Sequence, residues 1–158
     1  MHKMRLLMAI MTLMASAATP RPLPTGNVVP GRDLLGTWKC TYTAGAHPMT
    51  YSATFAYAMG GSWMRETDFS GGAANGEALY SYDRKSATWT AVIVLGDHTV
   101  TIFRASGPSA THIAYHSVYP DASMTDIFDR ISPTKYALHF TQIANGKPTK
   151  SNDTCTKT

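Results

Sequence analysis

Large and small residues alternate with a period of two between Met49 and Met59, and this is the clearest pattern in the chain. One face carries Met49, Tyr51, Phe55, Tyr57 and Met59, whereas the other carries only Thr, Ser and Ala. Successive side chains of a β-strand point to opposite faces, so this spacing predicts a strand with two chemically different sides.

Similar segments follow one another along the rest of the chain. From Gly36 onward no helical periodicity is sustained, and short runs rich in Thr, Tyr, Val, Ile, Phe and Trp are separated by turn residues such as Gly60-Gly61, Gly96-Asp97 and Asn145-Gly146. The series predicts an all-β fold, an up-and-down antiparallel meander of about 8–10 strands. Closure of the meander into a barrel would remove its exposed edges. The expected strands are 36–42, 49–59, 62–69, 77–82, 87–95, 98–105, 110–119, 122–131, 135–143 and 150–156.

Two cysteines lie at opposite ends of this series. Cys40 is in the first expected strand and Cys155 is in the last. A disulfide between them requires these two strands to be neighbours, because the Cα atoms must approach within about 4.4–6.8 Å. The sequence therefore predicts a Cys40–Cys155 disulfide that fastens a closed barrel.

The N-terminus predicts export to an oxidising compartment, where such a bond persists. A short basic stretch (1–5) precedes an apolar run (6–14) and the small residues 15–18, which is the pattern of a signal peptide. The apolar run is shorter than the ~20 residues of a membrane span. We expect a signal peptide at 1–18, a Pro-rich irregular leader at 19–32 and a β-barrel domain at 33–158, located in the periplasm or secreted.

Composition argues against some classes of partner. The formal charge is +4, and 15% of residues are charged against 44% that are hydrophobic. The basic residues are scattered, without the concentrated basic face that nucleic-acid binding needs. No other apolar run approaches the length of a membrane span, and the sequence does not indicate an oligomeric state.

Four motifs in order resemble a family of exported bacterial calycin-like proteins, related to lipocalins and fatty-acid-binding proteins. They are Gly36-Thr37-Trp38-Lys39-Cys40, Gly60-Gly61-Ser62-Trp63, Tyr82-Asp83 and Thr154-Cys155-Thr156-Lys157. The resemblance covers residues 33–158 and implies a calycin-like barrel. It also implies that Gly36 lets the chain cross close to the barrel floor and that the indole of Trp38 plugs that end.

The chain also departs from typical lipocalins. Their Thr-Asp-Tyr motif is not evident, and the arginine that covers the floor tryptophan from the last strand has no clear counterpart, although Lys157 is a candidate substitute. Haem-binding nitrobindin-like barrels open with a similar motif and hold iron through one late histidine. His139 is the nearest position here, so a haem-binding barrel is an alternative.

The aromatic residues of the alternating segment are candidates to line a ligand cavity. Tyr51, Phe55 and Tyr57, with Trp89 from a later strand, would face the interior, or they would pack into a dry core as in small barrels. Ten strands give a wider barrel, which favours a cavity.

The other polar residues give weaker indications of a functional site. His112 and His116 share a strand face but stand ~13 Å apart, too far to share one metal ion. Glu66 and Asp68 share a face and are expected to be solvated, whereas Asp126 and Asp129 point to opposite faces. No catalytic or metal-ligand motif is present. We therefore expect a non-catalytic exported barrel that binds a small, mostly apolar molecule without a cofactor, or else a structural or interaction module with a filled core.

Overall fold

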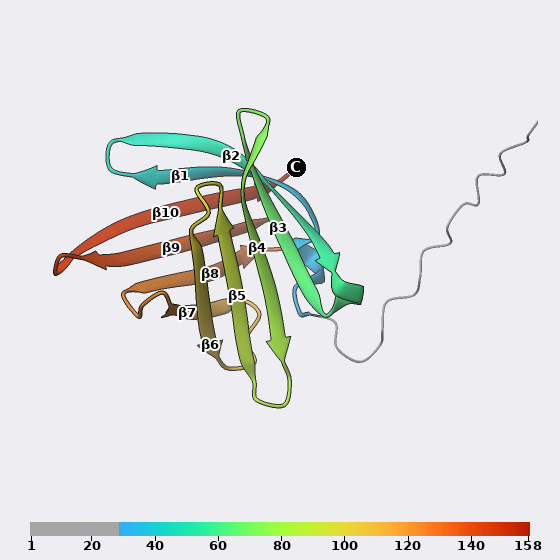
Figure 1. Cartoon of the computed structure of the whole chain (residues 1–158). Helices are drawn as coiled ribbons and strands as arrows, with labels where there is room; N and C mark the ends of the chain where they lie inside the picture. Colours follow the sequence, from blue (N-terminus) through green and yellow to red (C-terminus); the bar gives the residue numbers. More distant parts are fainter. Residues whose placement is uncertain (1–28) are drawn as a thin grey trace, which may run out of the picture.

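The computed structural model describes residues 29–158 and shows a closed barrel of ten antiparallel strands (Figure 1). Each strand pairs with its neighbours in sequence, and the first pairs with the last, so the predicted up-and-down fold is confirmed. The strands are β1 (Gly36–Ala44), β2 (His47–Ala58), β3 (Trp63–Ser70), β4 (Ala73–Asp83), β5 (Thr88–Leu95), β6 (Val100–Ser106), β7 (His112–Tyr119), β8 (Met124–Ser132), β9 (Lys135–Ala144) and β10 (Lys147–Lys157).

The barrel closes where β1 and β10 run side by side. Their register extends from Trp38 opposite Lys157 to Thr43 opposite Asn152. Cys40 lies directly opposite Cys155, and the two form the predicted disulfide. Each of the ten strands therefore has a hydrogen-bonded neighbour on both sides, which is how barrels avoid exposed edges. The disulfide indicates a non-reducing environment for the folded protein.

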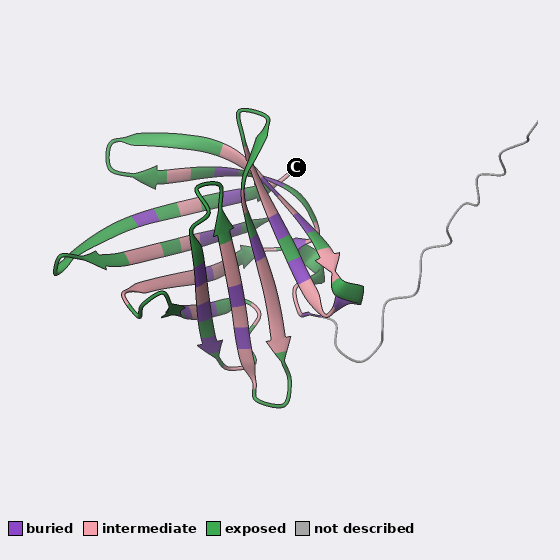
Figure 2. Cartoon of the chain, in the orientation of Figure 1, coloured by how far each residue is buried: buried purple, intermediate pink, exposed green. Residues whose placement is uncertain are grey.

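The period-two pattern of the sequence becomes an inner and an outer face. Buried and exposed bands alternate along most strands (Figure 2). In β2 the inward residues Ala53 and Phe55 are buried, and they oppose Trp38 and Gly36 of β1. The hydrophobic core is therefore the barrel interior, with Trp38, Phe103 and Tyr136 among its most deeply buried side chains.

Different structural elements lie at the two ends of the barrel. We call the floor the end that carries the 3-10 helices η1 (Arg32–Leu34) and η2 (Met59–Gly61), the β8–β9 turn and the C-terminus. The opposite end, the mouth, carries the turns of the β1–β2, β3–β4, β5–β6, β7–β8 and β9–β10 hairpins. Three of these, the β1–β2, β7–β8 and β9–β10 turns, project toward the same side in Figure 1.

The end of the predicted Pro-rich leader packs against the floor. Val29 is buried, and its N–H donates a hydrogen bond to the Gly61 carbonyl at 3.1 Å. Residues 1–28, which hold the predicted signal peptide and most of the leader, lie outside the described residues. Within residues 29–158, no helix has the length and hydrophobicity to cross a membrane.

One turn differs from its sequence-based expectation. The pair Gly96-Asp97 predicts a two-residue hairpin, but β5 ends at Leu95 and β6 begins only at Val100. Asp97 explains the longer turn, because its carboxylate accepts a hydrogen bond from the Thr99 N–H at 2.9 Å, and His98 adopts a φ of 71°. The Asn145-Gly146 turn is confirmed, with both residues at positive φ as a type I′ hairpin turn requires.

Candidate functional site

The floor of the barrel is built around the indole of Trp38, which is fully buried. Its Nε1–H donates a hydrogen bond to the Leu34 carbonyl of η1 at 2.7 Å. Two cations lie over its ring: the Arg130 guanidinium at 5.5 Å and the Lys157 ammonium at 5.4 Å from the ring centroid. Both are within the range of a cation–π interaction.

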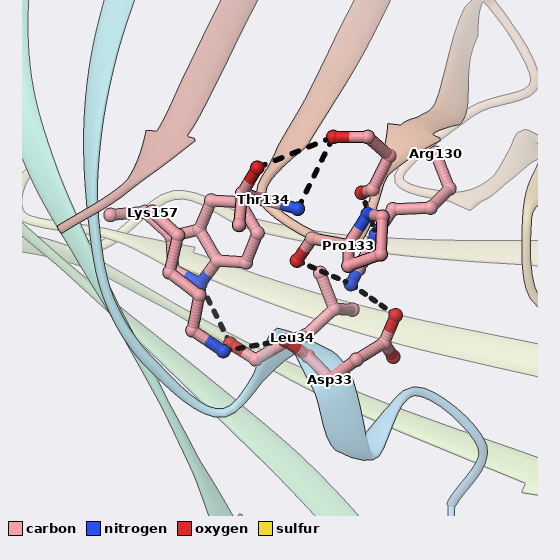
Figure 3. A network of polar contacts seen from close by, with 8 residues as sticks. Asp33, Leu34, Arg130, Pro133, Thr134 and Lys157 are labelled. Carbon is pink, nitrogen blue, oxygen red and sulfur yellow. Dashed lines mark hydrogen bonds and ion pairs between the residues drawn. The ribbon is translucent and has the colours of Figure 1, made fainter.

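The same two cations also hold η1 in place (Figure 3). Arg130 forms an ion pair with the Asp33 carboxylate, and the Lys157 ammonium donates a hydrogen bond to the Asp33 carbonyl at 2.7 Å. The Arg130 Nε–H donates to the Ser132 carbonyl at 2.7 Å. The positive charges of the floor thus have partners within the floor. Lys157 of the last strand covers the Trp38 ring, as the sequence suggested. Arg130 also covers this ring but comes from β8, and the sequence did not identify it.

Aromatic side chains fill the space directly above the floor. Tyr136 meets the Trp38 ring edge-on with centroids 4.9 Å apart, and it also contacts Phe55 at 6.0 Å and Phe128 at 5.4 Å. These rings come from β8, β9, β1 and β2, which lie within one continuous half of the barrel around β10. Such pairs stabilise a core beyond their simple burial.

Beside these rings lies a small interior cavity of about 30 Å³, which also borders Pro30 and Leu34 of the floor. A water molecule needs about 10–15 Å³ measured in this way, so the space holds about two. The wall is mostly aromatic and aliphatic but includes two carboxyl groups; the residues around it are Pro30, Leu34, Phe55, Met64, Glu66, Tyr80, Trp89, Ala110, Ile113, Tyr115, Asp126, Phe128, Tyr136 and Leu138.

The predicted lining residues separate into two groups. Phe55 and Trp89 border the cavity, and the Trp89 Nε1–H donates to the Ser109 carbonyl at 3.0 Å. Tyr51 is half-buried and packs against the core outside the cavity wall, and Tyr57 is half-buried as well. Ten strands do not give a wide cavity here, because bulky rings occupy most of the interior.

A larger hollow of about 400 Å³ lies beside β1, β2 and the β3–β4 turn. It is bordered by Thr37, Lys39, Thr50 and Ser52, which alternate with the inward-facing residues of their strands. This hollow is therefore on the outer surface and open to solvent.

Carboxyl groups enter the interior from three strands. Glu66 of β3 is only 5% exposed, and its Oε2 accepts a hydrogen bond from the Tyr80 hydroxyl at 2.6 Å. Asp126 of β8 borders the same cavity. Asp68 and Asp153 lie on the inward faces of β3 and β10. Each is one inward position closer to the mouth, Asp68 than Glu66 and Asp153 than Cys155. The expectation that Glu66 and Asp68 are solvated is therefore wrong, because their shared face is the inner one.

Burial controls the protonation of these groups. It raises the pKa of Asp68, Asp126 and Asp153 from 3.8 to about 6, and Asp153 contributes a further increase at the other two through charge repulsion. Burial and then repulsion from Asp68 raise the pKa of Glu66 well above its usual value, against the opposing effect of the Tyr80 hydrogen bond. Near neutral pH the three aspartates are thus mostly ionised inside the barrel.

These acids lack counter-charges. Among residues 29–158, none of the ion pairs involves an inward-facing acid of the barrel wall. One buried oxygen on each of Asp68, Asp126 and Asp153 has no hydrogen-bond partner. Burying a polar atom without a hydrogen-bond partner lowers the stability of the folded state, so such atoms are rare in folded proteins.

The histidines considered in the sequence lie outside the barrel. The His139 ring Nδ1 is 2.8 Å from the Asn152 side-chain oxygen, and His112 pairs with Asp129 at 2.6 Å. His139 is therefore turned away from the cavity, and this geometry gives the haem alternative no support. In the described part of the chain, no group of three or more His, Cys, Asp or Glu residues is arranged to hold a metal ion.

Comparison with known proteins does not assign this chain to a family. No family model matches the chain, and no curated protein matches it significantly. The barrel is compatible with the calycin-like resemblance of the motifs, and function must be argued from the interior itself.

Proposed function

We propose that this protein is an exported, non-catalytic barrel that binds a small, mostly apolar molecule in its interior. The observation that carries the proposal is the interior cavity whose wall is largely aromatic and aliphatic, inside a disulfide-closed barrel. Ligand pockets of this kind combine an apolar wall with a few polar groups that fix orientation.

Binding without catalysis suits the residues around the cavity. Its polar groups are carboxyls and tyrosine hydroxyls, and within the described residues that border it there is no Ser, Cys or His to act as a nucleophile or its base. The half-buried Met124 and Phe140 continue the apolar surface beyond the cavity, so a ligand larger than the cavity would lie against them.

Native mass spectrometry of the protein isolated from its own host tests this function. We expect a retained mass of a small molecule that is released on unfolding. Ala110 borders the cavity, so Ala110→Phe should abolish the retained mass, whereas Ala122→Phe, at the exposed β7–β8 turn, should keep it. A protein that retains nothing and is not stabilised by any small apolar compound would overturn the proposal.

The small cavity volume favours a second candidate, a structural or interaction module with a filled core. About 30 Å³ is far below the several hundred that pockets for drug-sized ligands occupy. The same pair of variants separates the candidates. In a filled-core module, Ala110→Phe would change stability but no binding property.

A further inference from the structure

We propose that the molecule bound in the barrel is an organic cation, an amine whose ammonium group is held between Glu66 and Asp126 against the surrounding aromatic rings. This inference rests on the proposed binding function and specifies the chemical class of its ligand. It accounts for polar groups that packing alone leaves unexplained.

The first support is the pair of carboxyl groups that border one cavity. Glu66 is 5% exposed and already accepts a hydrogen bond from Tyr80. Asp126 has a buried oxygen, Oδ1, without any partner. A primary ammonium brings three donors, so it can satisfy that oxygen and bond to Glu66 at the same time.

The second support is the set of aromatic rings around those carboxyls. The Tyr80 ring lies 6.4 Å from Tyr115 and 6.5 Å from Phe55, measured between centroids. All three border the cavity, together with Trp89. Ring faces attract cations, and the attraction is strongest where water is excluded.

The third support is the distribution of charge along the barrel. Asp68 and Asp153, each with an unpartnered buried oxygen, extend the negative charge toward the mouth. The cations of the floor do not compensate for it. Arg130 and Lys157 stand four residues, ~13 Å, from Asp126 and Asp153 on the same strands, and both are engaged by Asp33 and Trp38.

An interior of this kind discriminates by sign of charge. It attracts cations through the mouth and repels anions such as fatty acids. The cavity also discriminates by size, because its volume of about 30 Å³ suits a primary ammonium group, which is close to a water molecule in size. The apolar part of the ligand would then lie toward Met124 and Phe140, the latter directly opposite Asp126 in register.

The test uses three probes of similar shape and different charge: 2-phenylethylamine, 2-phenylethanol and 3-phenylpropanoate. Each is titrated by isothermal calorimetry at pH 7.5 into the purified full-length protein with its disulfide formed. We expect the amine to bind about tenfold or more tightly than the alcohol, since the hydroxyl carries no positive charge and only one donor in place of three. The carboxylate should show no binding.

The matched variants are Asp126→Asn, inside the barrel, and Asp129→Asn, three residues away on the outer face of the same strand. Asp126→Asn should weaken amine binding about tenfold and leave the affinity for the alcohol unchanged, whereas Asp129→Asn should alter neither. Thermal melts verify that both variants are folded.

The outcomes distinguish this inference from the function on which it rests. Equal affinity for amine and alcohol, or amine binding that Asp126→Asn leaves intact, overturns the cation site and leaves an apolar binding protein. Binding of none of the probes, together with no retained mass in the native protein, overturns both.

Discussion

The floor and the middle of the barrel differ in whether their charged side chains have partners. At the floor, Arg130 and Lys157 lie over the Trp38 ring; Arg130 forms an ion pair with the Asp33 carboxylate, and Lys157 donates a hydrogen bond to the Asp33 carbonyl. In the interior, Glu66 and Asp126 line a cavity, and among residues 29–158 no basic side chain borders it or forms an ion pair with either acid. The first arrangement stabilises the fold, whereas the second costs stability, and proteins keep such costs mainly at functional sites.

The comparison predicts that the floor responds most strongly to mutation. Trp38→Ala should lower the free energy of unfolding by about 3–5 kcal/mol, because it removes a fully buried indole and leaves two cations over an empty space. Urea denaturation with the disulfide intact measures the change. A loss below 1 kcal/mol would show that the floor is not the stabilising region.

Because acids are buried in the middle of the barrel, the free energy of unfolding should fall as the pH rises. Asp126 has a pKa of about 6 in the folded protein and 3.8 as its ordinary value, so between these values the native state binds more protons than the unfolded state. The stabilising effect of the neutral form is present below pH 4 and lost by about pH 7. At 1.4 kcal/mol per unit, Asp126 alone contributes a loss of about 3 kcal/mol.

Thermal melts between pH 4 and pH 8 check this prediction. Asp83, Asp97 and Asp121 act in the opposite direction, because side-chain hydrogen bonds within their turns lower their pKa and their contribution disappears only in more acidic solution. We therefore expect greatest stability at about pH 4–5. A melting temperature that rises steadily to pH 8 would contradict an interior of unpaired acids.

Asp126→Asn should stabilise the protein at pH 8, in contrast to most core mutations. It removes a buried negative charge and keeps the shape of the side chain, so we expect a gain of about 1–2 kcal/mol. The gain should disappear at pH 4.5, where the native carboxyl is already neutral. Asp129→Asn, on the outer face, is the control and should produce no gain. A loss of stability in Asp126→Asn at pH 8 would mean that the charge has a stabilising partner.

The smallest predicted effect is the difference in stability between variants of the two floor cations, Arg130 and Lys157. Arg130→Met should cost about 1–2 kcal/mol, because it leaves the Asp33 carboxylate without its ion pair and the Ser132 carbonyl without its donor. Lys157→Met should cost less, since it removes one hydrogen bond to a backbone carbonyl and one cation over the ring. Chemical denaturation of both variants gives the order, and the reverse order would assign the main role to the last strand.

The local pattern of the sequence predicts much of this fold. The alternation from Met49 to Met59 corresponds to β2 and the η2 residue that follows it, and the two cysteines correctly imply that the first and last strands are neighbours. Strand periodicity is a local rule, and the disulfide adds one geometric constraint between residues 115 apart in the sequence. These two signals do not depend on how distant side chains pack.

The interior site could not be predicted in the same way. Glu66 and Asp68 share a face, and the pairing of Glu66 with Phe55 shows that this face is the inner one. The volume of the cavity depends on how Tyr136, Phe128 and Phe55 meet across the barrel, and Arg130 reaches Trp38 from a strand distant in sequence. A useful signal was present in β3, where Met64 and Glu66 share the same parity and the apolar neighbour indicates the buried side.

The two ends of the barrel domain meet at the floor, and this has a practical consequence for engineering. The Thr158 N–H donates a hydrogen bond to the Thr37 carbonyl at 3.1 Å, next to the strand that begins the barrel. A short linker from Thr158 to the start of η1 would allow circular permutation, with new termini at the exposed Gly71-Gly72 turn of the mouth. The permuted barrel would keep its ten strands in the same cyclic order and present a fused reporter at the rim of the mouth.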